Sequence, residues 1–210
     1  MASNPWLTIP LEDHESHMSL PSVGQSSYLA GVLRRWADSL KPSSVAIPGC
    51  AGGNGFNVLS SSGVRRVVGI DINAAFLDAV RKRYSGMFHT LELLEGDINS
   101  PDCVFEPVEF IFAALIIEYV KPDQCLERLR SLVTAGGRVG VILQNASPDH
   151  AAVTPSPYSS LKSLEGMMTL VQSGDFRRLA AAAGFIILED RQQTLETGKS
   201  FSEFLLACRL

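Results

Sequence analysis

The stretches VAIPGCAGGNG, residues 45–55, and RVVGID, residues 66–71, decide the fold of this chain. The first is an apolar run that leads directly into a glycine-rich loop, and the second is an apolar run that ends on an acid. A short helical segment, residues 54–62, lies between them and is ended by Gly63. Glycines at the end of a strand let the backbone approach a ligand at the edge of a parallel sheet. We therefore expect an α/β fold with a ligand at this edge.

The same alternation of strand-like and helix-like segments continues to the end of the chain. Strand-like runs are residues 43–50, 64–72, 89–97, 108–117, 136–144, 185–195 and 200–210. Helix-like runs are residues 54–62, 74–84, a segment opened by Pro122, about 160–171 and 175–185. Apolar strands separated by helical crossovers indicate a parallel sheet covered on both faces, and the last two runs are close enough to pair antiparallel. The prediction is a doubly wound, mostly parallel seven-stranded sheet with an antiparallel C-terminal strand and helices on both faces.

Two segments fall outside this alternation. Residues 1–43 form a polar arm followed by a helix with one apolar face, and residues 44–210 form the α/β domain. An insertion at about 145–172, with Pro, Ser and Tyr residues, interrupts the domain after Gln144. Because both segments are rich in polar and turn-forming residues, we expect the arm and the insertion to act as lids.

Composition narrows the partners of the protein. The 210 residues carry a formal net charge of −4 with both signs mixed, which disfavours binding to nucleic acid. The longest apolar stretch, residues 108–120, is too short to span a bilayer and contains Glu109 and Glu118. The start of the chain has no secretory pattern, and the cysteines are scattered without a CxxC pair. We expect a cytoplasmic protein with reduced thiols.

The acid at the end of the second strand suggests the chemical class of the ligand. A carboxylate in the position of Asp71 can accept hydrogen bonds from both hydroxyls of a ribose. The loop and Asp71 therefore predict an adenosine pocket. The GxGxxG spacing that a dinucleotide pyrophosphate requires does not occur in residues 49–55, although an NAD(P)-dependent oxidoreductase remains an alternative.

Residues 49–55 and the triplet Gly-Ile-Asp at 69–71 resemble the glycine motif and the second motif of class I, Rossmann-like methyltransferases of the small bacterial type. The resemblance implies S-adenosylmethionine as methyl donor and S-adenosylhomocysteine as product. The acidic charge balance, the short chain and the insertion after the fifth strand favour a small-molecule acceptor. Two positions depart from the family pattern. Ile47 stands where an acid is frequent, so the methionine amino group needs other acceptors, and Ala51 replaces the middle glycine, which the loop tolerates if its φ is negative.

The resemblance also implies donor-binding residues on successive strands. Asp97 and Ile98 are expected at the adenine ring, with an acidic turn residue as the alternative reading of Asp97. Ala113 and Ala114 are expected beside the methionine part of the donor. The full set of expected donor-binding residues is Gly49, Cys50, Ala51, Gly53, Asn54, Gly55, Asp71, Ile72, Asp97, Ile98, Ala113 and Ala114.

A hydroxyl or ammonium acceptor must lose a proton, so a base is required for such acceptors. The candidates are His14, His17, Glu118 and Tyr119. The alternatives are that Tyr119 packs under a lid and that Glu118 is a solvated residue at a helix entry. His14 and His17 have a spacing that suits a metal on a helix, but no further ligands cluster nearby and we expect no metal. Because Ile47 departs from the family pattern and no base is obvious, a donor-binding subunit that is non-catalytic or regulatory is a second functional hypothesis.

Two further observations bear on the acceptor. The (Asp/Asn)-Pro-Pro-(Tyr/Phe) signature of many enzymes that methylate exocyclic or amide nitrogen is absent, which disfavours adenine in DNA and glutamine as acceptors. Apolar side chains of the insertion can form an acceptor wall, with packing in the core as the alternative. These side chains are Tyr158, Leu161, Met167 and Met168.

Overall fold

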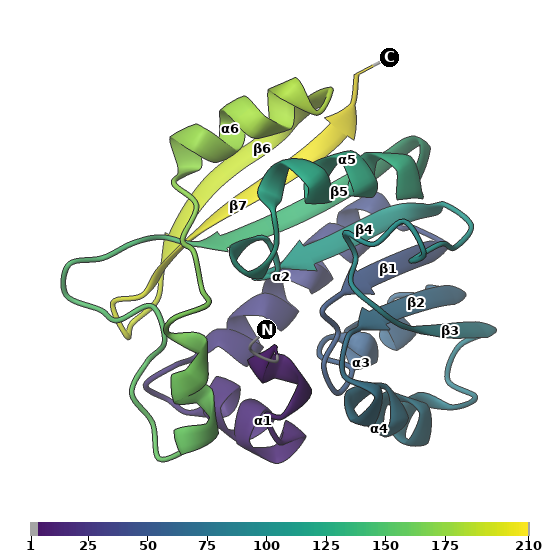
Figure 1. Cartoon of the computed structure of the whole chain (residues 1–210). Coiled ribbons are helices and arrows are strands. Elements are labelled where there is room, and N and C mark those ends of the chain that lie inside the picture. The colour runs from purple at the N-terminus through teal and green to yellow at the C-terminus, as the bar shows by residue number, and fades with distance from the viewer. Residues whose placement is uncertain (1–3, 210) are drawn as a thin grey trace.

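The computed structural model describes residues 4–209, in which a seven-stranded sheet has helices on both faces (Figure 1). The strands are β1 (Ser44–Pro48), β2 (Arg66–Asp71), β3 (Thr90–Glu95), β4 (Val108–Ala114), β5 (Val133–Gln144), β6 (Phe185–Thr194) and β7 (Ser200–Cys208). Their order is β3-β2-β1-β4-β5-β7-β6. β7 pairs antiparallel with β5 and β6, whereas the other neighbouring pairs are parallel. The predicted fold class is confirmed.

Two layers of helices enclose the sheet. The helices are α1 (Leu11–Ser19), α2 (Gln25–Leu40), α3 (Phe56–Ser61), α4 (Ala74–Tyr84), α5 (Pro122–Leu132) and α6 (Ser173–Ala182). Short 3-10 segments are η1 (Pro5–Leu7), η2 (Ile117–Tyr119) and η3 (Ser159–Leu164). Trp36 of α2 and Phe56 of α3 lie in the core layer on one face, and Leu126 of α5 and Phe176 of α6 lie in the layer on the other. Each face of the sheet therefore has its own apolar core.

Local sequence explains where the helices near the ligand edge begin. The side chain of Asn73 caps α4 by accepting a hydrogen bond from the backbone N–H of Ala75 at 3.0 Å. Gly55 caps α3 with a φ of +88°, a conformation that costs glycine little and other residues more. The carboxyl ends of β1 and β2 are thus each followed within a few residues by a helix start.

The insertion differs from its sequence prediction. The expected helix over about 160–171 is wrong, because only η3 forms and the chain is not helical again until α6. Gly166 follows η3, and glycine disfavours continuation of a helix. Beyond it, the backbone N–H of Thr169 donates to the carbonyl oxygen of Glu118 at 2.8 Å, which holds this segment against η2.

The amino-terminal arm is folded against the domain rather than extended from it. Glu15 of α1 forms an ion pair with Arg83 of α4. Asp13 of α1 accepts a hydrogen bond from the hydroxyl of Ser160 in η3 at 2.6 Å. Buried Ile9 packs with apolar side chains of η3 and its flanks. The arm and the insertion therefore form one joint cover, as Figure 1 shows for α1 beside the insertion. Whether this cover opens as a lid stays a prediction.

Two observations concern the environment of the chain. All four cysteines are free thiols, and Cys50, Cys103 and Cys125 are buried. Within residues 4–209, no helix combines the length and the apolar character needed to cross a membrane.

Candidate functional site

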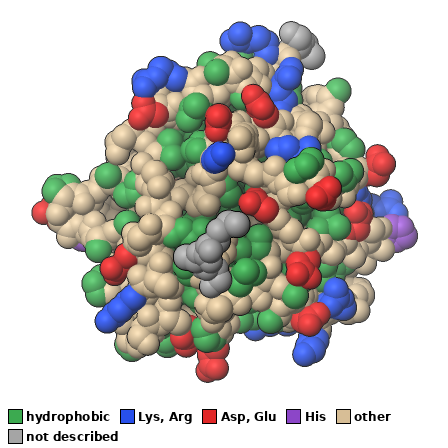
Figure 2. Space-filling model, in the orientation of Figure 1, with side chains coloured by type: hydrophobic (Ala, Val, Ile, Leu, Met, Phe, Trp, Pro, Cys, Tyr) green, Lys and Arg blue, Asp and Glu red, His purple; other side chains and the backbone are tan. Residues whose placement is uncertain are grey.

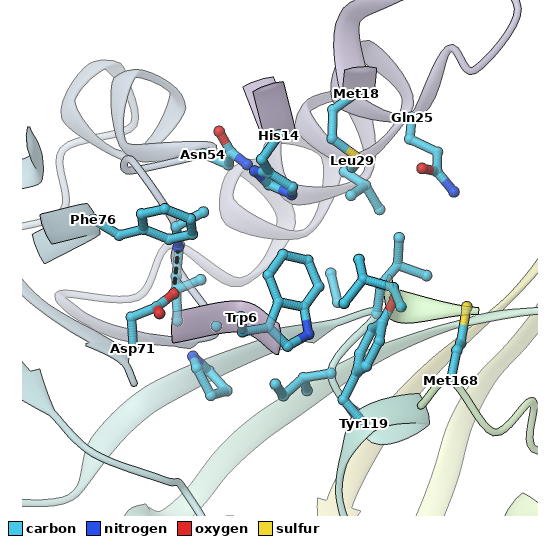
Figure 3. A pocket seen from close by; sticks show the side chains of 18 of the residues that line it. Trp6, His14, Met18, Gln25, Leu29, Asn54, Asp71, Phe76, Tyr119 and Met168 are labelled. Atoms are coloured by element: carbon cyan, nitrogen blue, oxygen red, sulfur yellow. Dashed lines mark hydrogen bonds between the residues drawn. The ribbon is translucent and has the colours of Figure 1, made fainter. Parts of the chain in front are cut away.

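A cavity of about 210 Å³ lies at the carboxyl edge of the sheet, where β2, β1, β4 and β5 end. The arm, the start of α2 and the insertion form its remaining walls. Figure 3 shows Asp71, Phe76 and Asn54 toward one end, Gln25, Met18 and Met168 toward the other, and Trp6 and Tyr119 between them. The predicted donor residues that line it are Gly49, Ala51, Asn54, Gly55, Asp71, Ile72, Asp97, Ile98 and Ala114.

Asp71 is buried at the end of β2 and organises the glycine loop. One carboxylate oxygen, Oδ2, accepts the backbone N–H of Ala51 at 2.9 Å, and Oδ1 accepts that of Asn73 at 3.0 Å. Burial raises the pKa of Asp71, and the backbone hydrogen bonds act in the opposite direction. A carboxylate offers about four lone-pair sites, so these two bonds leave capacity for two hydroxyl donors. The side chain thus holds the glycine loop in place and retains acceptor capacity for a ligand.

Two residues of the cavity wall other than glycine have a left-handed backbone conformation. Ala51 has a φ of +47° and Leu115, directly after β4, has a φ of +55°. The condition under which the loop would tolerate alanine at position 51, a negative φ, is therefore not met. Its N–H is held by the Asp71 carboxylate, and an alanine pays about 1–2 kcal/mol for this conformation. Strained residues concentrate at functional sites, and both of these face the same cavity.

Three predicted donor residues lie away from the cavity wall. The thiol of Cys50 is buried in the core under α3 and α4, and burial raises its pKa. Gly53 lies under the ring of Tyr84, where an added Cβ would be 2.4 Å from a ring carbon. Ala113 faces the core layer of α5 and α6, because successive residues of a strand point to opposite faces. These three positions shape the loop and the sheet rather than line the cavity.

Glu118 is also absent from the cavity wall, and it is not the solvated residue that was the alternative. Its side chain is buried, with Oε1 accepting the backbone N–H of Gln144 at 2.8 Å and Oε2 without a partner among the described residues. Burial raises the pKa of Glu118 to about 7. The carboxyl ties η2 to the end of β5 and does not touch the space in which a ligand would bind.

The other three base candidates line the cavity, and two of them, His14 and Tyr119, belong to a row of aromatic rings. The ring of Trp6 lies edge-on to His14 at 5.4 Å and to Tyr119 at 5.3 Å between centroids, and His14 stacks on Phe76 at 6.2 Å. Burial lowers the pKa of His14 to about 4, so the imidazole is neutral at pH 7 and only weakly basic. Burial raises the pKa of Tyr119, so its phenol stays protonated. His14 and Tyr119 therefore serve mainly as wall residues of the cavity rather than as bases.

His17, also buried, completes this group at the cavity wall. Its Nδ1 is buried and has no hydrogen-bond partner among the described residues. Burial lowers its pKa, and the nearby charge of Lys199 lowers it further. His17 and Lys199 therefore lie near each other in a polar region of the cavity, between the arm and the turn before β7.

That polar region is a network of three side chains. Gln144 Oε1 accepts from Gln25 Nε2 at 3.1 Å and from Lys199 Nζ at 3.3 Å. Lys199 Nζ also donates to the carbonyl oxygen of Ala152 at 3.2 Å. Burial lowers the pKa of Lys199 to about 8. Sequence reasoning missed Gln144 and Lys199 as site residues, because a lysine in a turn is ordinarily solvated and only the insertion packed above buries this one.

The apolar residues expected as an acceptor wall divide into two groups. Leu161, Met167 and Met168 line the cavity. Tyr158 instead packs within the cover, in a cluster with Ile9. Their role toward an acceptor stays a prediction.

Comparison with known proteins agrees with this geometry. Residues 46–141 match the family model described as a methyltransferase domain, so the predicted resemblance to class I methyltransferases is confirmed. No curated protein sequence matches the chain significantly.

Solved structures show where the same fold occurs. Magnesium protoporphyrin IX methyltransferase from Synechocystis PCC 6803, described with bound SAM, has a TM-score of 0.72 at 14% identity, with 100% of this chain and 99% of that chain covered. The CcbJ methyltransferase from Streptomyces caelestis has a TM-score of 0.65 at 14% identity, covering 91% and 98%. The [4+2]-cyclase SpnF has a TM-score of 0.67 at 11% identity, covering 86% and 82%. At these identities the likeness concerns the fold.

Proposed function

We propose, from the match of residues 46–141 to a methyltransferase domain model, that this protein transfers a methyl group from S-adenosylmethionine to a small organic acceptor. The observation that carries the proposal is the position of Asp71. It lines the same cavity as the glycine loop, accepts backbone N–H groups from both sides and retains lone pairs for ribose hydroxyls.

The residues around Asp71 fit the rest of the donor. Asp97 and Ile98 line the cavity after β3, where an adenine ring would meet a polar and an apolar side chain. Gly49 has a φ of +67°, and its N–H donates to the carbonyl oxygen of Ile70 at 2.8 Å, so its carbonyl group rather than its N–H would serve the methionine part. Ile47 contributes no acid, so backbone carbonyl groups of this loop would accept the methionine ammonium.

The acceptor is proposed to be small because the space beyond the donor end is enclosed. Apolar residues of α2 and the insertion, including Leu29 and Leu164, line it under the cover formed with the arm. On the face shown in Figure 2, acidic and basic side chains are interspersed, and no continuous basic surface is seen for a nucleic acid. The proposal includes a cytoplasmic protein, which free thiols favour.

The donor supplies an electrophilic methyl group on a sulfonium, whose positive charge disappears during transfer. The protein has to align the acceptor with this methyl group and to exclude water. The aromatic row of Trp6, His14 and Tyr119 performs the second task, since it places rings over the middle of the cavity. Backbone geometry at strained Leu115 helps to fix the wall on which the acceptor rests.

Calorimetry tests the donor assignment. Titration should show binding of S-adenosylmethionine and S-adenosylhomocysteine and no comparable binding of NAD or NADP. Tight binding of a dinucleotide without heat from either adenosyl compound would contradict the proposal.

Turnover tests the reaction. A donor with a labelled methyl group, incubated with the protein and a metabolite extract, should yield a labelled small molecule. Donor binding with no label transferred would favour the second hypothesis, a donor-binding protein without methyl transfer. We include this second hypothesis because the same fold occurs in a protein named as a cyclase rather than as a methyltransferase.

A further inference from the structure

Lys199 is a buried charge without a counter-ion. Its exposed fraction is 5%, and it lines the cavity. Among residues 4–209, no carboxylate oxygen lies within 4.0 Å of its ammonium group, and its observed partners are the neutral oxygens of Gln144 and Ala152. An ammonium group has three N–H donors, so one is left over. Buried charges are ordinarily paired, because removing them from water is costly.

The surroundings of Lys199 are arranged by the fold rather than by chance contact. It ends the turn between β6 and β7, where its carbonyl oxygen accepts the backbone N–H of Leu195 at 2.8 Å. The neighbouring Gly198 lies against the ring of His150 from the insertion, so closely that an added Cβ would be 2.3 Å from Nε2. The insertion therefore covers the turn between β6 and β7, and Lys199 becomes part of the cavity wall beneath it.

Other polar groups converge on the same place. Gln25 donates to the Gln144 oxygen that also accepts from Lys199. His17 lines the cavity nearby with its buried Nδ1 unpartnered among the described residues. No acid lines the cavity at this end, since the carboxylates of the described wall, Asp71 and Asp97, follow β2 and β3. The available donors and the charge all suit an anion.

We propose that Lys199, with Gln25 and His17 beside it, binds the carboxylate of the methyl acceptor, which is thus an apolar carboxylic acid whose nucleophilic atom lies at the other end of the molecule. This inference rests on the proposed function, because it assigns the substrate class of that same cavity. Met18, Leu29 and Met168 line the cavity and would contact the apolar body.

The order of the strands sets the distance between Asp71 and the Lys199 site. Asp71 ends β2 and Gln144 ends β5, with β1 and β4 between them. Three interstrand spacings of about 4.8 Å separate these ends by about 14 Å. The donor occupies the Asp71 side of this distance, so an acceptor of modest length reaches from the donor methyl group to Lys199.

The test uses matched acids and amides as probes. Octanoate with octanamide, and 3-(4-hydroxyphenyl)propanoate with its amide, are titrated into the full chain saturated with S-adenosylhomocysteine. The variant is Lys199→Met, which keeps the length of the stem without the charge, and the control is Lys162→Met at an exposed position. The parent and the control should bind an acid at least about tenfold more tightly than its amide. Lys199→Met should lose this preference and still bind S-adenosylhomocysteine as the parent does.

The outcomes separate the two proposals. Failure of the parent to bind S-adenosylhomocysteine would count against the proposed function. With that ligand bound, equal affinity of the parent for acid and amide, or no affinity for either acid, overturns the carboxylate site. A preference for the acid that persists in Lys199→Met overturns it as well. If Lys199→Met does not fold, Lys199→Arg, which keeps the charge, should retain the preference for the acid, and its loss there counts against the site.

Discussion

Asp71→Asn separates the two roles that the structure gives to this carboxylate. The side chain keeps its size, but one oxygen becomes an NH₂ group. Since Oδ1 and Oδ2 each accept a backbone N–H, the new NH₂ must face the N–H of either Ala51 or Asn73. Leaving one buried donor unpaired costs about 1–3 kcal/mol of unfolding free energy. At this chain length each kcal/mol lowers Tm by about 2–4 °C.

The same substitution weakens donor binding. Loss of one charge-assisted hydrogen bond to a ribose hydroxyl costs about 1.5–3 kcal/mol, which is roughly ten- to a hundredfold in the Kd for S-adenosylhomocysteine. Because burial raises the pKa of Asp71, affinity in the parent should also fall as acid protonates this group, and the variant should lack that part of the pH dependence. Calorimetry of binding and of unfolding measures both effects.

Exposed Asp102 provides the matched control, since Asp102→Asn makes the same chemical change away from the cavity. It should leave the Kd and Tm within error of the parent. A folded Asp71→Asn protein that binds S-adenosylhomocysteine within twofold of the parent would falsify the ribose assignment. A Tm equal to that of the parent would refute the loop clamp instead.

Three further predictions follow from buried or strained groups. Burial raises the pKa of Glu118 from 4.5 to about 7, so the folded state holds its proton more tightly than the unfolded state. Relative to Glu118→Gln, the parent should therefore lose roughly 3 kcal/mol of unfolding free energy as pH rises from about 4.5 to about 7, measured by urea denaturation across pH, and parallel curves would contradict this. Ala51→Gly should raise the unfolding free energy by roughly 1 kcal/mol because it relieves the left-handed conformation, and an unchanged urea midpoint would argue that the loop strain is negligible. Binding of S-adenosylhomocysteine should slow hydrogen exchange in residues 4–25. Deletion of the residues before Pro21 should weaken this binding, while unfolding stays cooperative. Unchanged exchange together with unchanged affinity would show that the arm is not needed for binding.

The sequence was sufficient where one local segment carries the whole signal. Alternating apolar runs and turn residues predicted a mostly parallel seven-stranded sheet, and the glycine loop with Asp71 predicted an adenosine pocket. Both depend on local features, namely a strand end and the helix start that follows it. The prediction of a helix over about 160–171 was wrong because the apolar residues keep a helical spacing across Gly166, although the backbone is not helical there.

What the sequence could not provide depends on contacts between distant segments. The positive φ of Ala51 occurs together with a hydrogen bond from its N–H to a carboxylate twenty residues away. Glu118 is buried because the end of β5 offers it a backbone N–H, which no pattern around residue 118 reveals. In the sequence, Lys199 has the pattern of an ordinary solvated lysine in a turn, and only the insertion packed over this turn buries it. The proposed donor-binding residues are thus predictable from local pattern, whereas Gln144 and Lys199 come together in the cavity only through contacts between distant segments.

The cover over the cavity connects these two ends. The carbonyl oxygen of Trp6 accepts a hydrogen bond from the side chain of Asn73 at 2.9 Å, and the backbone N–H of Asn73 donates to Asp71. On its other side, the ring of Trp6 meets Tyr119, close to the insertion that buries Lys199. Under the proposed function, the groups that bind the donor and the groups that enclose the acceptor thus share one residue of the arm. If donor binding steadies this residue, it steadies the acceptor wall too, and by linkage an acceptor favours the donor to the same extent. Such coupling means that the water-poor site needed for methyl transfer is complete only with both ligands in place.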